Sequence, residues 1–87
     1  MVKVSGTGRI VEGPFFYSDS GKGYGADLVI EFAKDRRIQA VSPNWLMTQS
    51  LYPLHNGQTV HFEGQLHSEE DGMYLVKLSL IRKFKRG

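Results

Sequence analysis

The sequence predicts an all-β fold, a small closed barrel of five strands with one short helix between the third and fourth strands. The strongest indication is the segment GQTVHFEGQL at positions 57–66. Its apolar side chains, Val60, Phe62 and Leu66, alternate with polar ones, a period of two that is typical of a half-buried strand. Gly64 stands on the apolar side, which indicates a bulge or a sharp bend. A short, strongly bent strand beside a long hairpin partner is how a small sheet closes into a barrel.

The same alternation indicates the first two strands. Residues 2–12 form the first strand, and Gly13-Pro14 is expected to end it. One side of this strand carries Val2, Val4, Gly6, Gly8 and Ile10. The two glycines on that side let the strand coil sharply around a barrel end. After a polar, glycine-rich loop, the second strand places four apolar residues on one side: Ala26, Leu28, Ile30 and Phe32.

A short helix is expected after a third strand at residues 37–41. Ser42 is a suitable N-cap, and Pro43 suits the first helical turn. The helix is expected to run to Leu51, because the residue before Pro53 disfavours helical geometry. Its predicted packing residues are Trp45, Leu46 and Leu51.

The last two strands are predicted to form a hairpin. Residues 59–68 make the fourth strand, Asp71-Gly72 supplies the turn, and residues 73–84 make the fifth strand. Three strands, a helix and two strands is the layout of the OB-fold, a barrel that binds ligands on its second and third strands and the loops after strands one and four. We expect residues 1–87 to form a single OB-fold domain.

Composition excludes several classes of protein. The 87 residues contain no cysteine, which rules out disulfides, thiolate zinc sites and cysteine nucleophiles. No apolar run approaches the roughly 20 residues of a membrane span, and no signal peptide is visible, so we expect a soluble, cytoplasmic protein without membrane partners. His61 and His67 share a strand face but are about 20 Å apart, too far to share a metal ion. Nothing places a nucleophile against a base, so the sequence predicts no enzyme, no cofactor and no metal site.

The positions of the basic and aromatic residues favour nucleic-acid binding. The net charge is only +2, but basic residues cluster at 34–37 and 82–86, and residues 15–17 form an unbroken aromatic run. Single strands bind in basic grooves whose aromatic side chains stack on the bases. The candidate nucleic-acid-binding residues are Arg9, Phe15, Phe16, Tyr17, Lys22, Tyr24, Arg36, Arg37, Trp45, Tyr74, Lys77, Arg82, Lys83 and Lys85.

Structural roles compete with binding at several of these positions. Side chains alternate along an extended chain, so at least one ring of the aromatic run should be exposed. Phe15 and Tyr17 could instead cap the barrel end, with Phe16 on the surface. Trp45 is interpreted first as a helix residue packed on the barrel or at a subunit contact. The basic C-terminal residues could form only a solvated end, and the glycine-rich loop 21–25 lacks the spacing of a phosphate-binding loop.

Two segments resemble the bacterial single-stranded DNA-binding protein family. Residues 4–10, VSGTGRI, with Pro14 shortly after, are similar to that family's opening strand. Residues 57–66 resemble its fourth-strand signature, in which Gly, Val, an apolar residue and Glu-Gly-Gln-Leu recur. The stretch 39–51 has the expected length and apolar placement. The resemblance implies an OB-fold that binds single-stranded DNA in replication, recombination or replication restart.

The chain also departs from that family. Those proteins usually carry a glycine-rich extension that ends in an acidic peptide, whereas this sequence ends in Lys85-Arg86-Gly87. Arg37 stands where a tryptophan is typical, and the hairpin between strands four and five is cut to residues 69–72. In its length the chain resembles the tail-less primosomal replication protein N, a dimeric relative. Small phage or plasmid single-strand binders fit its size equally.

The function predicted from the sequence is sequence-independent binding of single-stranded DNA. An RNA-binding OB-fold protein and a protein-interaction OB-fold module stay open as alternatives. Chains of this size often complete their cores by oligomerising, so we expect a homodimer or a tetramer. Replication or recombination proteins are further candidate partners.

Overall fold

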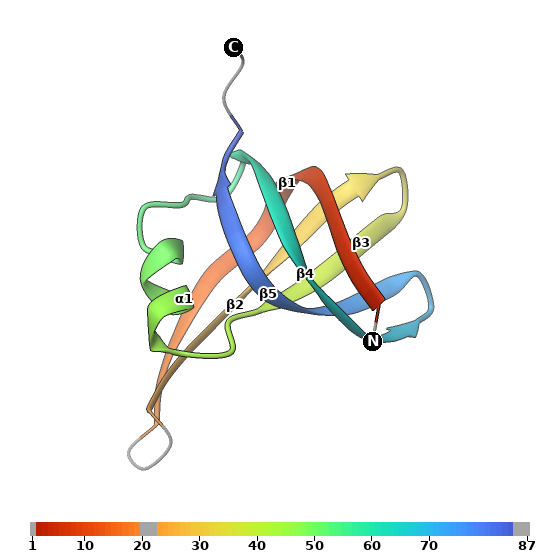
Figure 1. Ribbon diagram of the computed structural model, residues 1–87. Coiled ribbons are helices and arrows are strands. Elements are labelled where there is room, and N and C mark those ends of the chain that lie inside the picture. Colours follow the sequence, from red (N-terminus) through yellow and green to blue (C-terminus); the bar gives the residue numbers. More distant parts are fainter. Residues whose placement is uncertain (1, 20–22, 85–87) are drawn as a thin grey trace.

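The polypeptide folds into a closed five-stranded barrel with one helix. The computed structural model describes residues 2–19 and 23–84, with side chains for residues 2–17 and 25–84. The elements are β1 (Val2–Asp19), β2 (Gly23–Ala33), β3 (Arg36–Val41), α1 (Trp45–Leu51), β4 (Thr59–Glu70) and β5 (Met73–Lys83). The strands follow one another around the barrel as β1-β2-β3-β5-β4, and β4 closes it by pairing with β1 (Figure 1). The predicted barrel, with its helix between the third and fourth strands, is confirmed.

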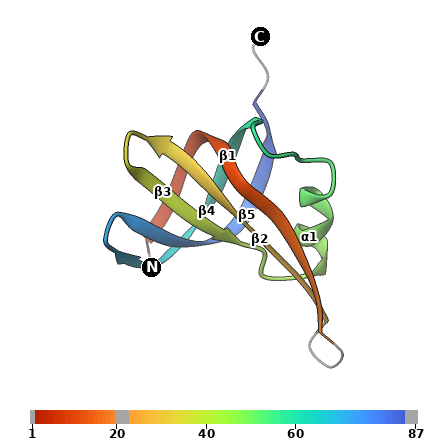
Figure 2. The same cartoon turned by 180° about the vertical axis from the view of Figure 1, so that it is seen from behind.

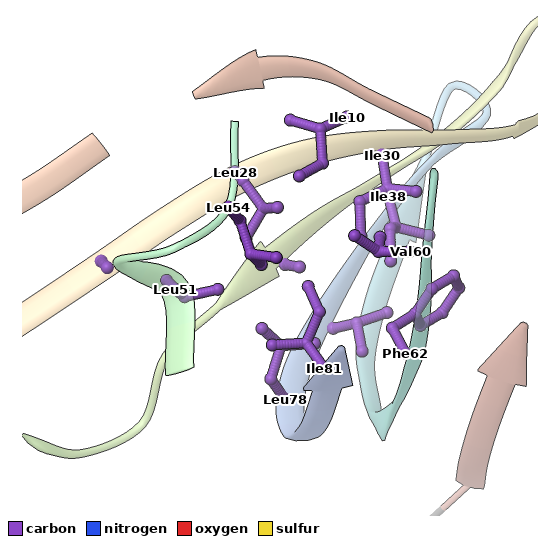
Figure 3. Packing of buried hydrophobic residues seen from close by; sticks show 13 residues of the cluster. Ile10, Leu28, Ile30, Ile38, Leu51, Leu54, Val60, Phe62, Leu78 and Ile81 are labelled. Carbon is purple, nitrogen blue, oxygen red and sulfur yellow. The ribbon is translucent and has the colours of Figure 1, made fainter. Parts of the chain in front are cut away.

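The core lies inside the barrel and takes side chains from every strand. Figure 3 shows these side chains converging from the strands, with Leu51 of α1 and Leu54 just after it closing one end. Val60 and Phe62 are 0% and 4% exposed, which confirms the buried side predicted for the fourth strand. The largest fully buried apolar side chains are Ile10, Leu28, Ile30, Leu51, Leu78, Val60 and Val76.

Two predicted irregularities in the β4–β5 hairpin are present. Glu63 pairs with Leu80 but Gly64 pairs with Leu78, so the register shifts at Gly64 as predicted, but the extra residue of the bulge is Ser79 on β5. A Cβ atom on Gly64 would lie 2.7 Å from Cγ1 of Val76, so no larger residue fits where β4 and β5 approach. The hairpin turn has φ angles of 51° at Asp71 and 80° at Gly72, which is the left-handed geometry of the predicted turn.

The first strand is longer than predicted. Gly13-Pro14 does not end β1, because both residues fall in the register shift between Glu12 and Phe15, where no ladder hydrogen bond is needed. The first half of β1 pairs with β4 and its second half pairs with β2. The far part of the β1–β2 hairpin therefore projects from the barrel on the side where α1 lies (Figures 1 and 2).

The helix differs from the prediction in its start and in its buried side. Asn44, and not Ser42, is the N-cap, since its side-chain oxygen accepts a hydrogen bond from the Met47 N–H at 2.9 Å. The Ser42 hydroxyl lies inside, 2.7 Å from the hydroxyl of Thr48. The predicted packing residue Leu51 is buried, but Leu46 is 72% exposed, so the prediction is wrong for Leu46; Trp45 is 47% exposed. Within the described ranges, no helix has the length and apolar character needed to cross a membrane.

Candidate nucleic-acid interface

Four neighbouring strands, β1, β2, β3 and β5, present their outward side chains on one continuous surface. In one row across these strands, Arg9 pairs with Glu31, Glu31 with Arg37, and Arg37 with Met73. Directly paired residues project from the same side of a sheet, so each row is a set of surface neighbours. We call this surface the four-strand face. It comprises Arg9, Glu12, Phe15, Tyr17, Asp27, Glu31, Arg37, Gln39, Val41, Met73, Leu75 and Lys77, and Val29 lies on the same side of β2 but is buried.

A second row brings an aromatic ring and a cation to the same face. Phe15 pairs with Asp27, Asp27 with Val41, and Val41 with Lys77. Tyr17 follows Phe15 by two residues on β1 and so projects from the same side of the strand. The four-strand face therefore combines rings and cations, as a surface for single-stranded nucleic acid requires.

Hydrogen bonds hold Tyr17 in place on this face. Its hydroxyl donates to Oδ2 of Asp27 at 2.7 Å, and the Gln39 side-chain amide donates to the same oxygen at 3.3 Å. The hydrogen bond to Asp27, together with slight burial and the negative charge of Asp27, raises the pKa of Tyr17 above its ordinary value. The Tyr17 hydroxyl therefore stays protonated as a donor, and its ring is oriented before any ligand arrives.

The charges of the face are mixed. Nε of Arg37 lies 3.2 Å from Oε2 of Glu31, and the two side chains are 48% and 33% exposed. Because a guanidinium carries five N–H donors, this ion pair leaves Arg37 donors for a phosphate. Arg9 and Lys77 are exposed. The carboxylates of Glu12, Asp27 and Glu31 lie on the same face, so it is not uniformly basic.

The three rings of the aromatic run divide between two surfaces. Phe15 and Tyr17 are 53% and 51% exposed on the four-strand face, so the alternative in which they cap the barrel end is wrong. Phe16 projects from the opposite side and stacks on Tyr52, with ring centroids 4.8 Å apart and planes at 28°. Trp45 precedes Tyr52 by seven residues, nearly two helical turns, and so lies on the same side of α1. We call Phe16, Trp45 and Tyr52 the helix-side cluster.

Other predicted binding residues lie away from the four-strand face. Arg36 is next to Arg37 on β3 and projects from the opposite side, since successive side chains alternate. Tyr74 is half-buried and packs on Phe32, with ring centroids 5.9 Å apart. Arg82 and Lys83 border an open cavity of about 800 Å³ near the end of β5, together with His61 and Phe84.

Three of the predicted residues cannot be placed on either surface. Lys22 and Lys85 lie outside the described residues, and so does the side chain of Tyr24. Among the residues that the structure describes, no three His, Cys, Asp or Glu side chains gather closely enough to hold a metal ion.

Sequence reasoning missed Asp27 and Gln39 as members of the site. Asp27 lies between Ala26 and Leu28, which were predicted to face inward, so alternation alone puts Asp27 on the outward side. Its position beside Phe15 and Tyr17 depends on the β1–β2 register, which shifts twice between Ile10 and Phe15. Those shifts have no local sequence signal that fixes their size, so the contact of Tyr17 with Asp27 could not be foreseen.

A closed five-stranded barrel with a helix between β3 and β4 is an OB-fold, and comparisons with solved structures agree. The chain is similar to the small single-stranded DNA-binding protein of Streptomyces coelicolor, with TM-score 0.78 and 18% identity over 99% of this chain and 96% of that one. It is similar to the mitochondrial single-stranded DNA-binding protein of S. cerevisiae, with TM-score 0.77 and 16% identity over 99% and 97%.

The dimeric N-terminal domain of the PriB protein from Thermoanaerobacter tencongensis is a third similar structure, with TM-score 0.63 and 15% identity over 97% of each chain. No protein-family model and no curated protein sequence matches the chain. The TM-scores establish a shared fold, and at identities this low the similarity extends to the fold alone.

Proposed function

We propose that the four-strand face binds single-stranded DNA. The observation that carries the proposal is the presence of two half-exposed rings, Phe15 and Tyr17, on the same face as three cations, Arg9, Arg37 and Lys77. The rings would stack on bases, and the cations would contact phosphates. The similar structures from S. coelicolor and S. cerevisiae are single-stranded DNA-binding proteins, which supports this choice of ligand.

The proposed role is to hold exposed strands during replication, recombination or replication restart, in the cytoplasm and without catalysis. Stacking tolerates every base, because each base has a π face, so binding should extend over all sequences. The proposed contacts need no cofactor, since the face itself supplies both rings and cations. Replication or recombination proteins would meet this chain on the same DNA.

The mixed charge of the face sets the expected salt dependence. Three cations give roughly three phosphate contacts, so the logarithm of the binding constant should fall with the logarithm of the salt concentration with a slope of about −2. Glu31 competes with phosphate for Arg37, because their ion pair must open or share donors when the ligand binds. Affinity should therefore rest more on stacking than on charge.

Titration of labelled oligonucleotides at several salt concentrations tests the proposal. We expect single-stranded DNA to bind more tightly than duplex of the same length, with the shallow salt slope given above. Competition with a ribo-oligonucleotide of the same sequence separates DNA binding from RNA binding. Equal binding of single strand and duplex would reject the proposal, and a clear preference for the ribo-oligonucleotide would favour an RNA-binding role.

We further propose that the protein forms a homodimer through the helix-side cluster. Phe16, Trp45 and Tyr52 are 43%, 47% and 53% exposed, and an apolar surface of this kind is typical of contacts between subunits. The similar PriB domain is described as dimeric, which supports an oligomer. Light scattering should give about twice the 9.8 kDa chain mass, and Trp45→Lys should reduce the measured mass to that of a single chain. A monomer at high concentration would reject the dimer.

A further inference from the structure

The carboxylate of Asp27 occupies the middle of the four-strand face, where phosphate binding gives it no role. Asp27 pairs with Phe15 on one side, and Lys77 stands two strands away in the same row, roughly 10 Å at the usual strand spacing. A carboxylate repels phosphate, so the DNA backbone should run toward Lys77 and avoid Asp27. A base stacked on Phe15 or Tyr17 then has its polar edge close to Asp27.

The surroundings of Asp27 orient its carboxylate and leave it able to accept further hydrogen bonds. Both the Tyr17 hydroxyl and the Gln39 amide donate to one oxygen, Oδ2. These donors come from β1 and β3, so the carboxylate is held from both sides. An ionised carboxylate has about four acceptor positions, and two donors do not fill them.

We infer that Asp27 reads the hydrogen-bonding edge of one bound base and favours guanine. This inference rests on the proposed function and narrows it. Because Tyr17 and Gln39 both donate to Oδ2, the acceptor positions that stay open are the two of Oδ1. Guanine presents two adjacent donors, its N1–H and its amino group, which can donate to these two positions together. Cytosine and adenine each present one amino group, whereas thymine presents one N–H between two carbonyl oxygens that a carboxylate repels. Bases of single strands are read by hydrogen bonds of this kind on their Watson–Crick edges.

The other two carboxylates of the face are less suited to this role. Oε2 of Glu31 is paired with Arg37 at 3.2 Å. Glu12 pairs with Val29, in a row that contains neither of the exposed rings. Glu31 therefore provides a matched control for Asp27, since both are acidic residues on the outward side of β2.

Binding of three oligonucleotides tests the inference. The first is a run of about 12 thymidines, the second has one dG at the centre of that run, and the third has one deoxyinosine there, which resembles dG but lacks its amino group. The wild type should bind the dG oligonucleotide about fivefold to tenfold more tightly than the thymidine one, with deoxyinosine between them. In Asp27→Asn the preference should fall below about twofold, and in Glu31→Gln it should persist. Both substitutions remove one negative charge, so a general gain in affinity cancels in the ratio.

The outcomes separate this inference from the proposed function. If no oligonucleotide binds to the wild type, the proposed function fails. If all three bind equally, or if the preference for dG survives in Asp27→Asn, the reading role of Asp27 is rejected and the proposed function stands. Loss of the preference in both variants also rejects it, because the effect would then be one of charge. Circular dichroism checks folding, and Asn can still accept the Tyr17 hydrogen bond.

Discussion

The four-strand face and the helix-side cluster both take rings from one aromatic run, yet they differ in chemistry. Phe15 and Tyr17 lie on the face among charged residues, and Tyr17 is hydrogen-bonded to Asp27 at 2.7 Å. Phe16, between them, stacks on Tyr52 beside α1. Alternation along β1 alone separates the rings, so three consecutive aromatic residues serve two surfaces.

The contrast indicates that the role of a ring depends on its neighbours more than on the ring itself. Rings set among cations suit a ligand that has both bases and phosphates. Rings that stack on one another are typical of side-chain packing and of protein–protein contacts. Substitutions on the two surfaces test this division of roles.

Removing the rings of one surface should affect DNA binding and removing those of the other should not. Each stacking ring contributes about 1–3 kcal/mol, so Phe15→Ala with Tyr17→Ala should weaken binding of single-stranded DNA about 30-fold or more. Phe16→Ala with Tyr52→Ala should change it less than about twofold, because those rings lie off the face. Fluorescence anisotropy measures both. Equal losses in the two double variants would contradict the division.

The adjacent cations Arg36 and Arg37 provide a second contrast. Arg37→Gln should reduce the slope of the salt dependence by about 0.7 and weaken binding a few-fold, as should Lys77→Gln. Arg36→Gln should leave the slope unchanged, because Arg36 projects from the other side of β3. The measurement is oligonucleotide titration at several salt concentrations. An effect of Arg36→Gln as large as that of Arg37→Gln would show that both sides of β3 contact DNA.

The stacked pair of the helix side should contribute to stability. A double-mutant cycle on Phe16→Ala and Tyr52→Ala should give a coupling of about 0.5–1.5 kcal/mol in the free energy of unfolding. The same cycle on Phe15→Ala and Tyr52→Ala should give a coupling near zero, since these rings lie on different surfaces. Urea denaturation measures both. A coupling of zero between Phe16 and Tyr52 would show that their stacking does not stabilise the fold.

The smallest effect concerns the pKa of Tyr17. Its hydrogen bond to Asp27 raises this pKa above the ordinary value of 10.0, so the bond stabilises the fold below pH 10 and is lost as the pH rises through the raised pKa. Asp27→Asn removes the charge, and Tyr17 should then lose its proton at a lower pH. NMR titration of the Tyr17 ring resonances follows this change. Identical titration curves would mean that Asp27 does not hold Tyr17.

Much of the barrel could be predicted because its signals are local. Alternation of Val60 and Phe62 with polar neighbours placed the buried side of β4, and Asp71-Gly72 gave the hairpin turn. Gly64 indicated the register shift, since a glycine on the apolar side of a strand marks a close approach of backbones, although the extra residue, Ser79, lies on β5. The helix was found, but its N-cap was misplaced because the Ser42 hydroxyl bonds to Thr48 in the interior.

The arrangement of the site depends on register, which the sequence does not specify. Gly13-Pro14 suggested the end of a strand, but both residues fit inside a register shift and β1 continues to Asp19. Only with that continuation do Phe15 and Tyr17 reach Asp27 on β2. The rings and cations could therefore be listed from the sequence, and alternation separated Phe16 from Phe15 and Tyr17, whereas the neighbours that each side meets could not be predicted.

An NMR titration with a short single-stranded oligonucleotide tests most directly whether the outward side of β1, β2, β3 and β5 is where DNA binds. We expect the backbone amide resonances of Arg9, Asp27 and Gln39 to shift, and the side-chain resonances of Phe15 and Tyr17 with them. The indole resonance of Trp45, on the other surface, should stay in place. Shifts concentrated at Trp45 and Tyr52, with the strand residues unchanged, would contradict the assignment of binding to this side of the barrel.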